Sequence, residues 1–569
     1  MTKKLYGASV SISLCCLVAV RVWAAELQHA DLLLTNGKVI TVDSKFSIAT
    51  TVAVRDGHIV EVGGDEVAAK FETARKLDVG GRAVLPGFND THIHVNAMPH
   101  RAIDLESARS IVQIQDRLRA KAKQLGPGQW ITGYGWDEAL LAEHRNPSRA
   151  DLDAAAPDNP VVLVRAGAHS SVGNSAALRI AKITRATADP ARGLIEHDAK
   201  GEPNGIVRER NDLFEAHVPP DSWDSLRDSY ISAFKSLFAL GITSVHTMGT
   251  LDDEPVGMGG DGKPGSGLTY RRVRELSEAT TIPRVTLYIS YPGAARLQSF
   301  PHHSGFGDER VRLGAIGENA VDGGFTGPTA WTLVDYKGLP GFRGKGRYTD
   351  QELQDMVDTC ARLGWQMGLH AIGDAAIVQT VNAYSRAIRT LLPKDTDHRW
   401  FLDHFTVMPP DATMQRMSED GILIAQQPNF LWNLEGRYVA TLDDWRLRHN
   451  NSVGTPQKRF GLFVAFGSDN LPIGPMTGLQ AAVTRRGPSG VIHGPEESVS
   501  VPEAIRMYTA SGAFLSREEQ IKGTLEAGKL ADMIVLDADP LSIAAADLMK
   551  AQVDLTILGG NVVYERKDP

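Results

Sequence analysis

Short runs of apolar residues, separated by glycines and polar turns, mark both ends of the chain. Near the N-terminus their length and spacing are typical of a small antiparallel β unit. These runs lie at 31–34, 38–42, 51–54 and 58–62, and similar ones close the chain at 531–537, 553–558 and 561–565. Because neither group is large enough to fold alone, we expect the two ends to pair into one β-sandwich.

Between the two ends, strand-like runs alternate with helical patterns. The apolar runs include 242–245, 284–289, 313–316, 366–369 and 462–466, and the helical segments include 226–240 and 350–363. Alternation over such a length favours an α/β fold, a (β/α)8 TIM barrel, with the small β-sandwich domain built from both chain ends. A stretch rich in Gly, Asp and Met at 249–267 predicts a long mobile loop.

The first residues have the pattern of an export signal. Lys3 and Lys4 precede an apolar stretch at about 8–20, and Val22-Trp23-Ala24 offers a small-residue cleavage site. The alternative is a membrane anchor, but the stretch is shorter than the ~20 residues that a spanning helix needs. We therefore expect a signal peptide over 1–25 and an exported, periplasmic or secreted protein, with no stable membrane insertion after cleavage.

Composition narrows the possible partners and the redox chemistry. The 569 residues include 60 basic and 68 acidic side chains, for a net charge of -8, which argues against a nucleic-acid surface. Of three cysteines, two lie in the leader, so Cys360 alone cannot form an internal disulfide. Cys360 lies in a helical pattern and is expected to be a buried helix residue rather than a nucleophile.

The strongest local motif is His92-Ile93-His94, which directly follows an apolar run. Residues two apart on a strand point to the same side, so the pair aims two imidazoles at one point. That arrangement suits a metal that prefers nitrogen ligands. The motif is weak by itself, because two histidines with this spacing also occur by chance.

Other candidate ligands end further apolar runs. His370 follows the run at 366–369, His404 follows Phe401 and Leu402, and Asp469 follows the run at 462–466. In a barrel, the carboxyl ends of all strands meet at one face, where catalytic groups lie. Their order along the chain therefore predicts a metal centre of histidine and carboxylate ligands.

Together these stretches resemble the amidohydrolase superfamily, most closely its amidohydrolase-3 branch, from about Asp31 to Glu565. The matching segments are 86–94, 165–169, 174–178, 241–246, 370–376, 467–469 and 522–532. The resemblance implies β-sandwich parts at 26–86 and 520–569 and a metal-dependent TIM barrel at 87–519, with an insertion around 96–225 over the barrel mouth. It also implies a centre of one or two metals, usually zinc.

The resemblance assigns the ligands residue by residue. His92 and His94 would hold the more buried metal with Asp469, and His370 and His404 would hold the second. Many family members bridge the metals with a carboxylated lysine just before an Asp-Gly pair, where this chain has Glu318. A glutamate carries a bidentate carboxylate without modification, so we expect Glu318 to bridge two Zn²⁺ per chain, other divalent metals being alternatives. The alternative is a mononuclear site without this role for Glu318.

Two more histidines are candidate catalytic residues alongside Asp469. His246 ends the run at 242–245, beside the metals or the substrate, and His169 lies in the inserted region, where it would polarise a substrate carbonyl. For both, a structural hydrogen bond is the rival interpretation. Six aromatic residues near expected loops hint at an apolar substrate group, although packing explains them equally well: Trp130, Tyr134, Trp136, Trp331, Phe430 and Trp432.

The implied function is hydrolysis of a carbon–nitrogen bond, an amide or N-acyl/N-formyl group of a small molecule, by a metal-activated hydroxide. Asp469 would serve as general base and then acid. Carbamate or lactone cleavage needs the same groups. A one-metal deaminase of the same superfamily is the first rival, although its H-x-x-E motif reads His370-Ala371-Ile372-Gly373 here. A catalytically silent binding protein is the second rival, and a homo-oligomer remains open.

Overall fold

Eight parallel strands form one sheet that curls into a nearly closed barrel, as the alternating pattern predicted. Each strand pairs in parallel with the next along the chain. In sheet order they are β10 (Phe88–Ile93), β17 (Ile242–Gly249), β18 (Arg284–Ile289), β19 (Val311–Gly317), β20 (Met367–Ala371), β21 (Phe401–His404), β22 (Leu423–Gln426) and β23 (Val464–Phe466). All eight carboxyl ends therefore open on one face.

The computed structural model describes residues 1–2, 27–191, 193–252, 267–469, 471 and 473–567. The predicted signal peptide lies outside the described residues except for residues 1–2. The predicted loop at 249–267 lies outside them except for residues 249–252 and 267. Among the described residues, no helix is both long and apolar enough to cross a membrane.

The inside of the barrel is filled by two large rings. Tyr288 and Phe401 are buried with their ring centroids 5.5 Å apart. Glycines on the neighbouring strands make room for them: a Cβ added to Gly368 would lie 2.1 Å from Phe401, and one added to Gly314 would lie 2.6 Å from Tyr288. The barrel interior at these strands is thus a packed core.

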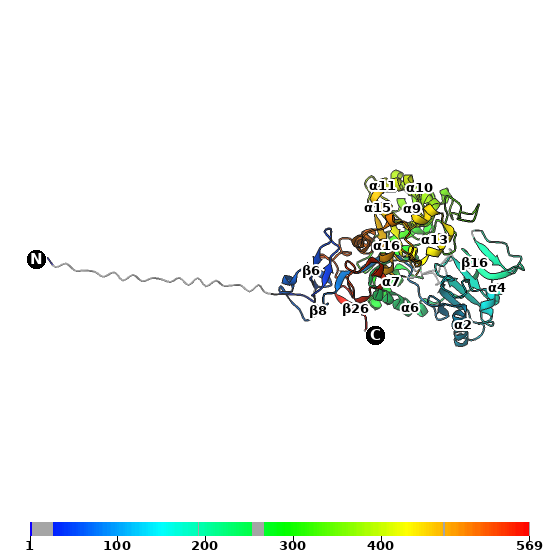
Figure 1. Cartoon of the computed structure of the whole chain (residues 1–569), viewed down its shortest axis with the longest axis horizontal. Helices are drawn as coiled ribbons and strands as arrows, with labels where there is room; N and C mark the ends of the chain where they lie inside the picture. The colour runs from blue at the N-terminus through cyan, green and yellow to red at the C-terminus, as the bar shows by residue number, and fades with distance from the viewer. Residues whose placement is uncertain (3–26, 192, 253–266, 470, 472, 568–569) are drawn as a thin grey trace.

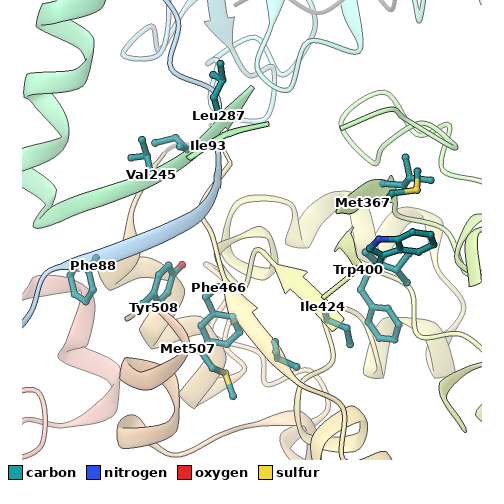
Figure 2. Close-up of a cluster of buried hydrophobic side chains, with 14 of the residues drawn as sticks. Phe88, Ile93, Val245, Leu287, Met367, Trp400, Ile424, Phe466, Met507 and Tyr508 are labelled. Carbon is teal, nitrogen blue, oxygen red and sulfur yellow. The ribbon is translucent and has the colours of Figure 1, made fainter. Parts of the chain in front are cut away.

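The seam between the first and last strands is joined through side chains. Tyr508 packs edge-on against Phe88 of β10 and Phe466 of β23, with centroids 6.0 and 5.3 Å away (Figure 2). Just above it, the Ser468 backbone N–H donates to Asp90 at 2.9 Å and the Asp469 N–H donates to the His92 carbonyl at 2.7 Å. These bonds hold the end of β23 beside the end of β10.

Helices surround the barrel, and the longer ones pack an apolar face against it, as α9 shows. In α9, a capping box of Thr349 and Glu352 starts the helix, and Leu353, Val357 and Cys360 lie buried on its inner side. The helices after β10 and the insertion are α6 (Trp223–Ser236), η1 (Leu237–Leu240), α7 (Tyr270–Ala279), α8 (Ala294–Ser299), α9 (Asp350–Arg362), α10 (Asp374–Thr390), α11 (Asp411–Asp420), α12 (Asn429–Asn433), α13 (Glu435–Thr441), α14 (Asp444–Arg448), α15 (Gly454–Phe460), α16 (Pro475–Thr484), η2 (Pro495–Glu497), α17 (Val501–Met507) and α18 (Ala510–Leu515).

The two chain ends pack as the predicted β-sandwich, seen as blue strands beside red ones in Figure 1. Alternation along β2 sends Leu32 and Leu34 into the core between the sheets and Leu33 to the other face. One sheet contains β6 (His58–Gly63), β5 (Thr51–Arg55), β2 (Leu32–Thr35) and β8 (Lys76–Asp78). The other contains β26 (Asn561–Glu565), β25 (Val553–Leu558), β24 (Met533–Leu536), β9 (Ala83–Pro86), β3 (Lys38–Ile40) and β4 (Ile48–Ala49). Beside them lie β1 (Gln28–His29), α1 (Asp65–Ala68), β7 (Phe71–Glu72) and η3 (Ala545–Lys550).

The segment between β10 and α6 forms an α/β unit with its own sheet, at the opposite side of the molecule from the sandwich (Figure 1). Along β13, Leu163 joins the core under α2 and α3, whereas Val162 joins the core under α4 and α5. The sheet order is β11 (Ala102–Asp104), β12 (Ile131–Trp136), β13 (Val161–Arg165), β14 (Ser170–Gly173), β16 (Pro203–Arg208) and β15 (Leu194–His197). Its helices are α2 (Ile111–Leu125), α3 (Arg149–Asp153), α4 (Ser175–Ile180) and α5 (Asp212–Glu215).

The packed barrel interior predicts a large effect from a single methyl group. Gly368→Ala should lower the free energy of unfolding by about 1–3 kcal/mol, because the new Cβ overlaps the Phe401 ring. Gly436→Ala is the control: in α13 an added Cβ meets nothing within 4 Å, so stability should rise by about 0.5–1 kcal/mol. Urea unfolding followed by circular dichroism measures both. Equal stability of the two variants would contradict the packing argument.

Candidate metal centre

The six side chains that the sequence assigned as metal ligands meet at the carboxyl end of the barrel. His92 lies near the end of β10 and His94 just after it, His370 lies in β20 and His404 ends β21. The two carboxylates directly follow strands, Glu318 after β19 and Asp469 soon after β23. Five different strands therefore supply one cluster.

Glu318 stands at the middle of this cluster. Its carboxylate oxygens lie among ring nitrogens of four histidines: His370 Nδ1 at 3.3 Å, His404 Nε2 at 3.6 Å, His94 Nε2 at 3.8 Å and His92 Nε2 at 4.0 Å. Asp469 adds a second carboxylate, with Oδ1 3.4 Å from His94 Nε2. A pair of carboxylates within a ring of imidazoles is the donor set of zinc and similar divalent cations.

Two overlapping groups have donor atoms close enough to share an ion. The donor atoms of His92, His94 and Asp469 all lie within 4.8 Å of one another, and so do those of His92, Glu318 and His404. His370 approaches the second group through Glu318. The two groups share His92, so the described residues contain the donor atoms for a divalent metal site.

Three of the six candidate ligands have a strained backbone. Glu318, His404 and Asp469 have φ values of 56°, 77° and 57°, in the left-handed region that residues other than glycine rarely adopt. Each lies where a strand turns outward, and the turn aims its side chain back over the barrel mouth. Strain of this kind persists where the surrounding structure enforces it, and it collects at functional sites.

Polar neighbours orient the histidines from behind. Asp403 Oδ1 lies 3.2 Å from His92 Nδ1, and Gln427 Oε1 lies 2.8 Å from His404 Nδ1. With Nδ1 engaged, each ring turns Nε2 toward Glu318. The sequence analysis missed both residues. The signal for Asp403 was its place directly before His404, whereas nothing marked Gln427.

The carboxylates of the cluster create a negative potential that favours a cation. Burial disfavours the charged ring of His92, but the charges of Asp403 and Glu318 outweigh burial and raise its pKa to about 9. Burial likewise opposes the charged form of Asp469, yet His94 and His92 lower its pKa. The Nε2 atom of His92 and that of His404 are buried, and neither makes a hydrogen bond within the described part of the chain. Buried nitrogens without hydrogen bonds, facing carboxylates, fit a bound divalent metal ion.

Asp322 shapes the rim beside the cluster. It accepts backbone N–H groups of Ile372 at 3.0 Å, Gly373 at 2.8 Å and Trp331 at 2.8 Å. These bonds join the loop after β19 to the loop after β20. Strand β20 itself carries His370. Asp322 thus fixes the backbone of both loops beside the cluster.

A small chamber of about 30 Å³ lies over the cluster. Its wall contains His94, Asn96, Gly167, Ala168, His169, Glu318, Gly324, Phe325, Thr326, His370, Ile372, His404, Thr406, Phe430, Leu434, Tyr438, Asp469 and Leu471. A cavity needs roughly 10–15 Å³ to hold one water, so the chamber accommodates only a few heavy atoms. The reacting group of a substrate fits here, but a whole substrate does not.

His169 reaches this chamber from the insertion. It lies between β13 and β14, and its Nδ1 is 3.1 Å from Glu209 Oε2. Glu209 is also bonded by Arg347 Nη2 at 2.8 Å and by the Thr329 hydroxyl. A Cβ added to Gly324, on the chamber wall, would lie 2.8 Å from His169 Nε2. The free edge of the ring therefore faces the chamber.

His246 has a different setting. It is buried within β17, and its Nδ1 lies 2.7 Å from the Tyr288 hydroxyl inside the barrel. Burial, with the charges of Lys522 and His92, lowers its pKa well below the usual value. His246 is not among the residues that line the chamber. His246 is thus a neutral ring whose Nδ1 is bonded to Tyr288, while its buried Nε2 makes no hydrogen bond among the described residues.

The six aromatic candidates separate into two kinds. Phe430 lines the chamber and stacks on His404 with centroids 5.8 Å apart, and Tyr134 lines a larger cavity next to it. Trp130 and Trp136 pack in the cores of the insertion. Neither Trp331 nor Trp432 lines either cavity.

Comparisons with known proteins agree with this architecture. Residues 76–564 match the model of the amidohydrolase family. N-substituted formamide deformylase from Arthrobacter pascens is 29% identical, over 95% of this chain and 99% of that relative. The crystal structure of an uncharacterized metal-dependent hydrolase from Pyrococcus horikoshii OT3 has a TM-score of 0.69 at 23% identity, over 90% of this chain and 99% of that one. A similar hydrolase from Pyrococcus furiosus has a TM-score of 0.66 at 24% identity, over 90% of this chain and 100% of that one, and both likenesses concern the fold.

The buried pair of Glu209 and His169 predicts a pH-dependent stability. Burial would raise the pKa of Glu209, but His169 and Arg347 lower it from 4.5 to about 2. A lowered carboxyl pKa stabilises the fold above about pH 4.5 and loses this effect as the pH falls toward 2. Glu209→Gln should therefore cost about 3 kcal/mol at pH 7, and the difference from the wild type should shrink below pH 4.5.

Urea unfolding between pH 7 and pH 3 measures this difference. Glu565→Gln, at an exposed position of β26, is the matched control and should change stability by less than about 0.5 kcal/mol throughout. A deficit of Glu209→Gln that stays constant from pH 7 to pH 3 would contradict the linkage.

Proposed function

The chain belongs to the amidohydrolase family, and from that premise we propose that it hydrolyses an amide or N-acyl bond of a small molecule with a divalent metal centre. The observation that carries the proposal is Glu318, held within 4.0 Å of ring nitrogens from four histidines, with Asp469 alongside. The name of the Arthrobacter relative, an N-substituted formamide deformylase, supports carbon–nitrogen cleavage.

We propose two zinc ions per chain, bridged by Glu318. His92, His94 and Asp469 would hold one ion, and His370 and His404 would hold the other. When bound, such ions supply Lewis acidity and make water a better nucleophile at neutral pH. The support is that Glu318 lies beside the histidines proposed for each ion, with His94 and His92 on one side and His370 and His404 on the other.

Asp469 is the residue that moves the proton. Its carboxylate lines the chamber, and the neighbouring His94 and His92 lower its pKa, so it is ionised at neutral pH and able to accept a proton from water. The same group then gives the proton to the leaving nitrogen, which departs as an amine. Its place at the seam, fixed by the bond from its own N–H to the His92 carbonyl, keeps it beside the reacting group.

His169 is placed to act on the carbonyl oxygen. Glu209 engages Nδ1, so Nε2 faces the chamber and, when protonated, donates a hydrogen bond to a substrate oxygen. A donor aimed at the oxygen that gains charge during attack stabilises the transition state. The small chamber around it favours a short acyl group, such as formyl.

The structure disfavours the deaminase alternative. The H-x-x-E motif of those enzymes would need a glutamate at Gly373, but a Cβ there would lie 1.9 Å from the Trp331 carbonyl oxygen. No side chain fits at that position without moving the loop after β19. Carbamate and lactone hydrolysis use the same groups as amide hydrolysis, so these substrates belong in the first activity panel.

We also propose that the protein is exported, to the periplasm or beyond. The support is the sequence of the leader, with Lys3, Lys4, the apolar stretch at 8–20 and Val22-Trp23-Ala24. A small-molecule substrate is part of the same proposal, and the small volume of the chamber supports it.

The role of Glu318 is tested by metal content. Purified wild-type chain should carry two metal ions, measured by plasma mass spectrometry, and should hydrolyse N-formyl amines. Glu318→Gln keeps the shape of the side chain but loses its charge, so content should fall to about one ion and kcat/KM by about 100-fold or more. Glu72→Gln, exposed on β7, should change neither quantity. Full content and full activity in Glu318→Gln would refute the bridge.

The role of His169 is tested by separating metal binding from catalysis. His169→Gln should keep the metal content of the wild type and lower kcat by about 10²–10³-fold, the usual loss for a transition-state donor. Stopped-time assays with N-formyl and N-acetyl amines measure kcat and KM. An unchanged kcat would show that His169 serves only to hold the insertion in place.

A further inference from the structure

A second and much larger cavity adjoins the chamber. It has a volume of about 420 Å³, within the ~300–1,000 Å³ range of small-molecule sites. The insertion supplies one wall through β11 and β12, and α6 of the barrel supplies the other. His94 and Asn96 line both cavities, so the large cavity begins where the metal cluster ends.

Tyr134 stands at the border of the two cavities. Its ring lines the large cavity, and its hydroxyl accepts a hydrogen bond of 3.1 Å from the N–H of Gly167, which lines the chamber. Burial, with the charges of Asp469 and Glu106, raises the pKa of Tyr134 above its usual value. The phenol of Tyr134 at the border is therefore neutral, and Asp469 and Glu106 both lie close enough to raise its pKa.

Most of the residues that line the large cavity are apolar. The apolar lining residues include Val95, Ala97, Met98, Ala102, Ile103, Val164, Val218, Leu226, Tyr230, Ala233, Leu237 and Ile473. Such a surface gains free energy by burying a hydrocarbon or aromatic group in proportion to its area. It is the natural place for the part of a substrate that the small chamber cannot hold.

The same wall carries an excess of negative charge. Asp104, Glu106, Glu215 and Asp221 line the cavity, and Arg101 lies among them in an ion pair with Asp221. Asp104 and Glu106 are exposed, so they lie where the cavity meets solvent. No ion pair or hydrogen bond to the Glu106 carboxylate is seen among the described residues, and its stem packs against Gly135, next to Tyr134. The rim thus offers a carboxylate to a cationic group.

The position of Asp469 determines which part of the substrate lies in the large cavity and which part lies in the chamber. The group that Asp469 protonates is the leaving nitrogen, and Asp469 Oδ1 lies 3.4 Å from Nε2 of His94, one of the two residues that line both cavities. The nitrogen and its substituent therefore point to the large cavity. The acyl part stays beside His169 in the 30 Å³ chamber.

We propose that the large cavity binds the N-substituent of the substrate, and that this substituent is an apolar body ending in a positively charged group held by Glu106 and Asp104. The substrate class is a short-chain N-acyl derivative of a diamine or of a similar amine with a second cationic centre. This inference rests on the proposed function of the metal centre and adds a specificity to it.

Charge recognition is tested with matched substrates. The metal-loaded enzyme is assayed with two N-formyl benzylamines, one with a para-aminomethyl group and one with an isosteric para-hydroxymethyl group. The wild type should prefer the ammonium substrate, and Glu106→Gln should raise KM for it about 10-fold with little change in kcat or in the neutral substrate. Glu72→Gln is the control. Equal KM values for both substrates in the wild type would overturn the proposal.

Steric recognition is tested by filling the cavity. Ala233→Phe on α6 projects a ring into the cavity and should raise KM for the benzyl substrates, while N-methylformamide should react as in the wild type. Ser232→Phe, at the exposed neighbouring position, should leave both unchanged. Retained turnover of N-methylformamide shows that the variant is folded. Undiminished turnover of the benzyl substrates by Ala233→Phe would place the substituent elsewhere.

A binding measurement distinguishes the proposed hydrolysis from the proposed binding of a cationic group in the large cavity. Calorimetry with para-xylylenediamine, the product-like diamine, should show binding that Glu106→Gln weakens, whether or not any amide is hydrolysed. Binding of this kind without amide turnover would contradict the proposed function but would still support a cavity that binds cationic groups. Turnover of N-formyl amines with no diamine binding would keep the function and overturn the cavity.

Discussion

The structure depends on the burial of one carboxylate, Glu318, among the imidazoles of four histidines. A buried charge is costly unless nearby groups of opposite charge or a metal compensate it, so these strand ends cannot drift apart without leaving Glu318 uncompensated. Much of the local structure serves this arrangement. Left-handed backbone at Glu318, His404 and Asp469 turns the side chains inward, and Asp403 and Gln427 hold two rings from behind.

The barrel and the insertion contribute different parts of the proposed substrate site. The barrel is filled below its mouth by Tyr288 and Phe401, so chemistry is confined to the strand ends. The insertion then covers this mouth, brings His169 to the chamber and forms one wall of the 420 Å³ cavity. A rigid barrel for the reacting groups and an added α/β unit for the remainder of the substrate would allow specificity to change without disturbing the metal centre.

Sequence patterns predicted the barrel and the sandwich because both rest on local periodicity. Leu32, Leu33 and Leu34 alternate between two cores, as a strand with two buried faces requires, and the runs before His370 and Asp469 end where β20 and β23 carry these residues to the mouth. The sheet of the insertion was not predicted, since its pattern was interpreted only as a covering segment. His246 and His169 looked equivalent in sequence, yet one bonds Tyr288 inside the barrel and the other faces the chamber.

By itself, the sequence determined the fold class, the positions of the strands that carry chemistry and the set of histidine and carboxylate residues that the structure brings together. The fold class and the strand positions depend on residue type and on spacing along the chain, which the sequence contains directly, whereas the full ligand set, Glu318 above all, was implied by the resemblance to the amidohydrolase superfamily. Only the tertiary structure decided which groups touch: Asp403 behind His92, Glu209 behind His169, and Tyr134 between the two cavities. Each of these contacts joins separate secondary-structure elements, and its geometry is set by how the barrel closes and how the insertion packs on it.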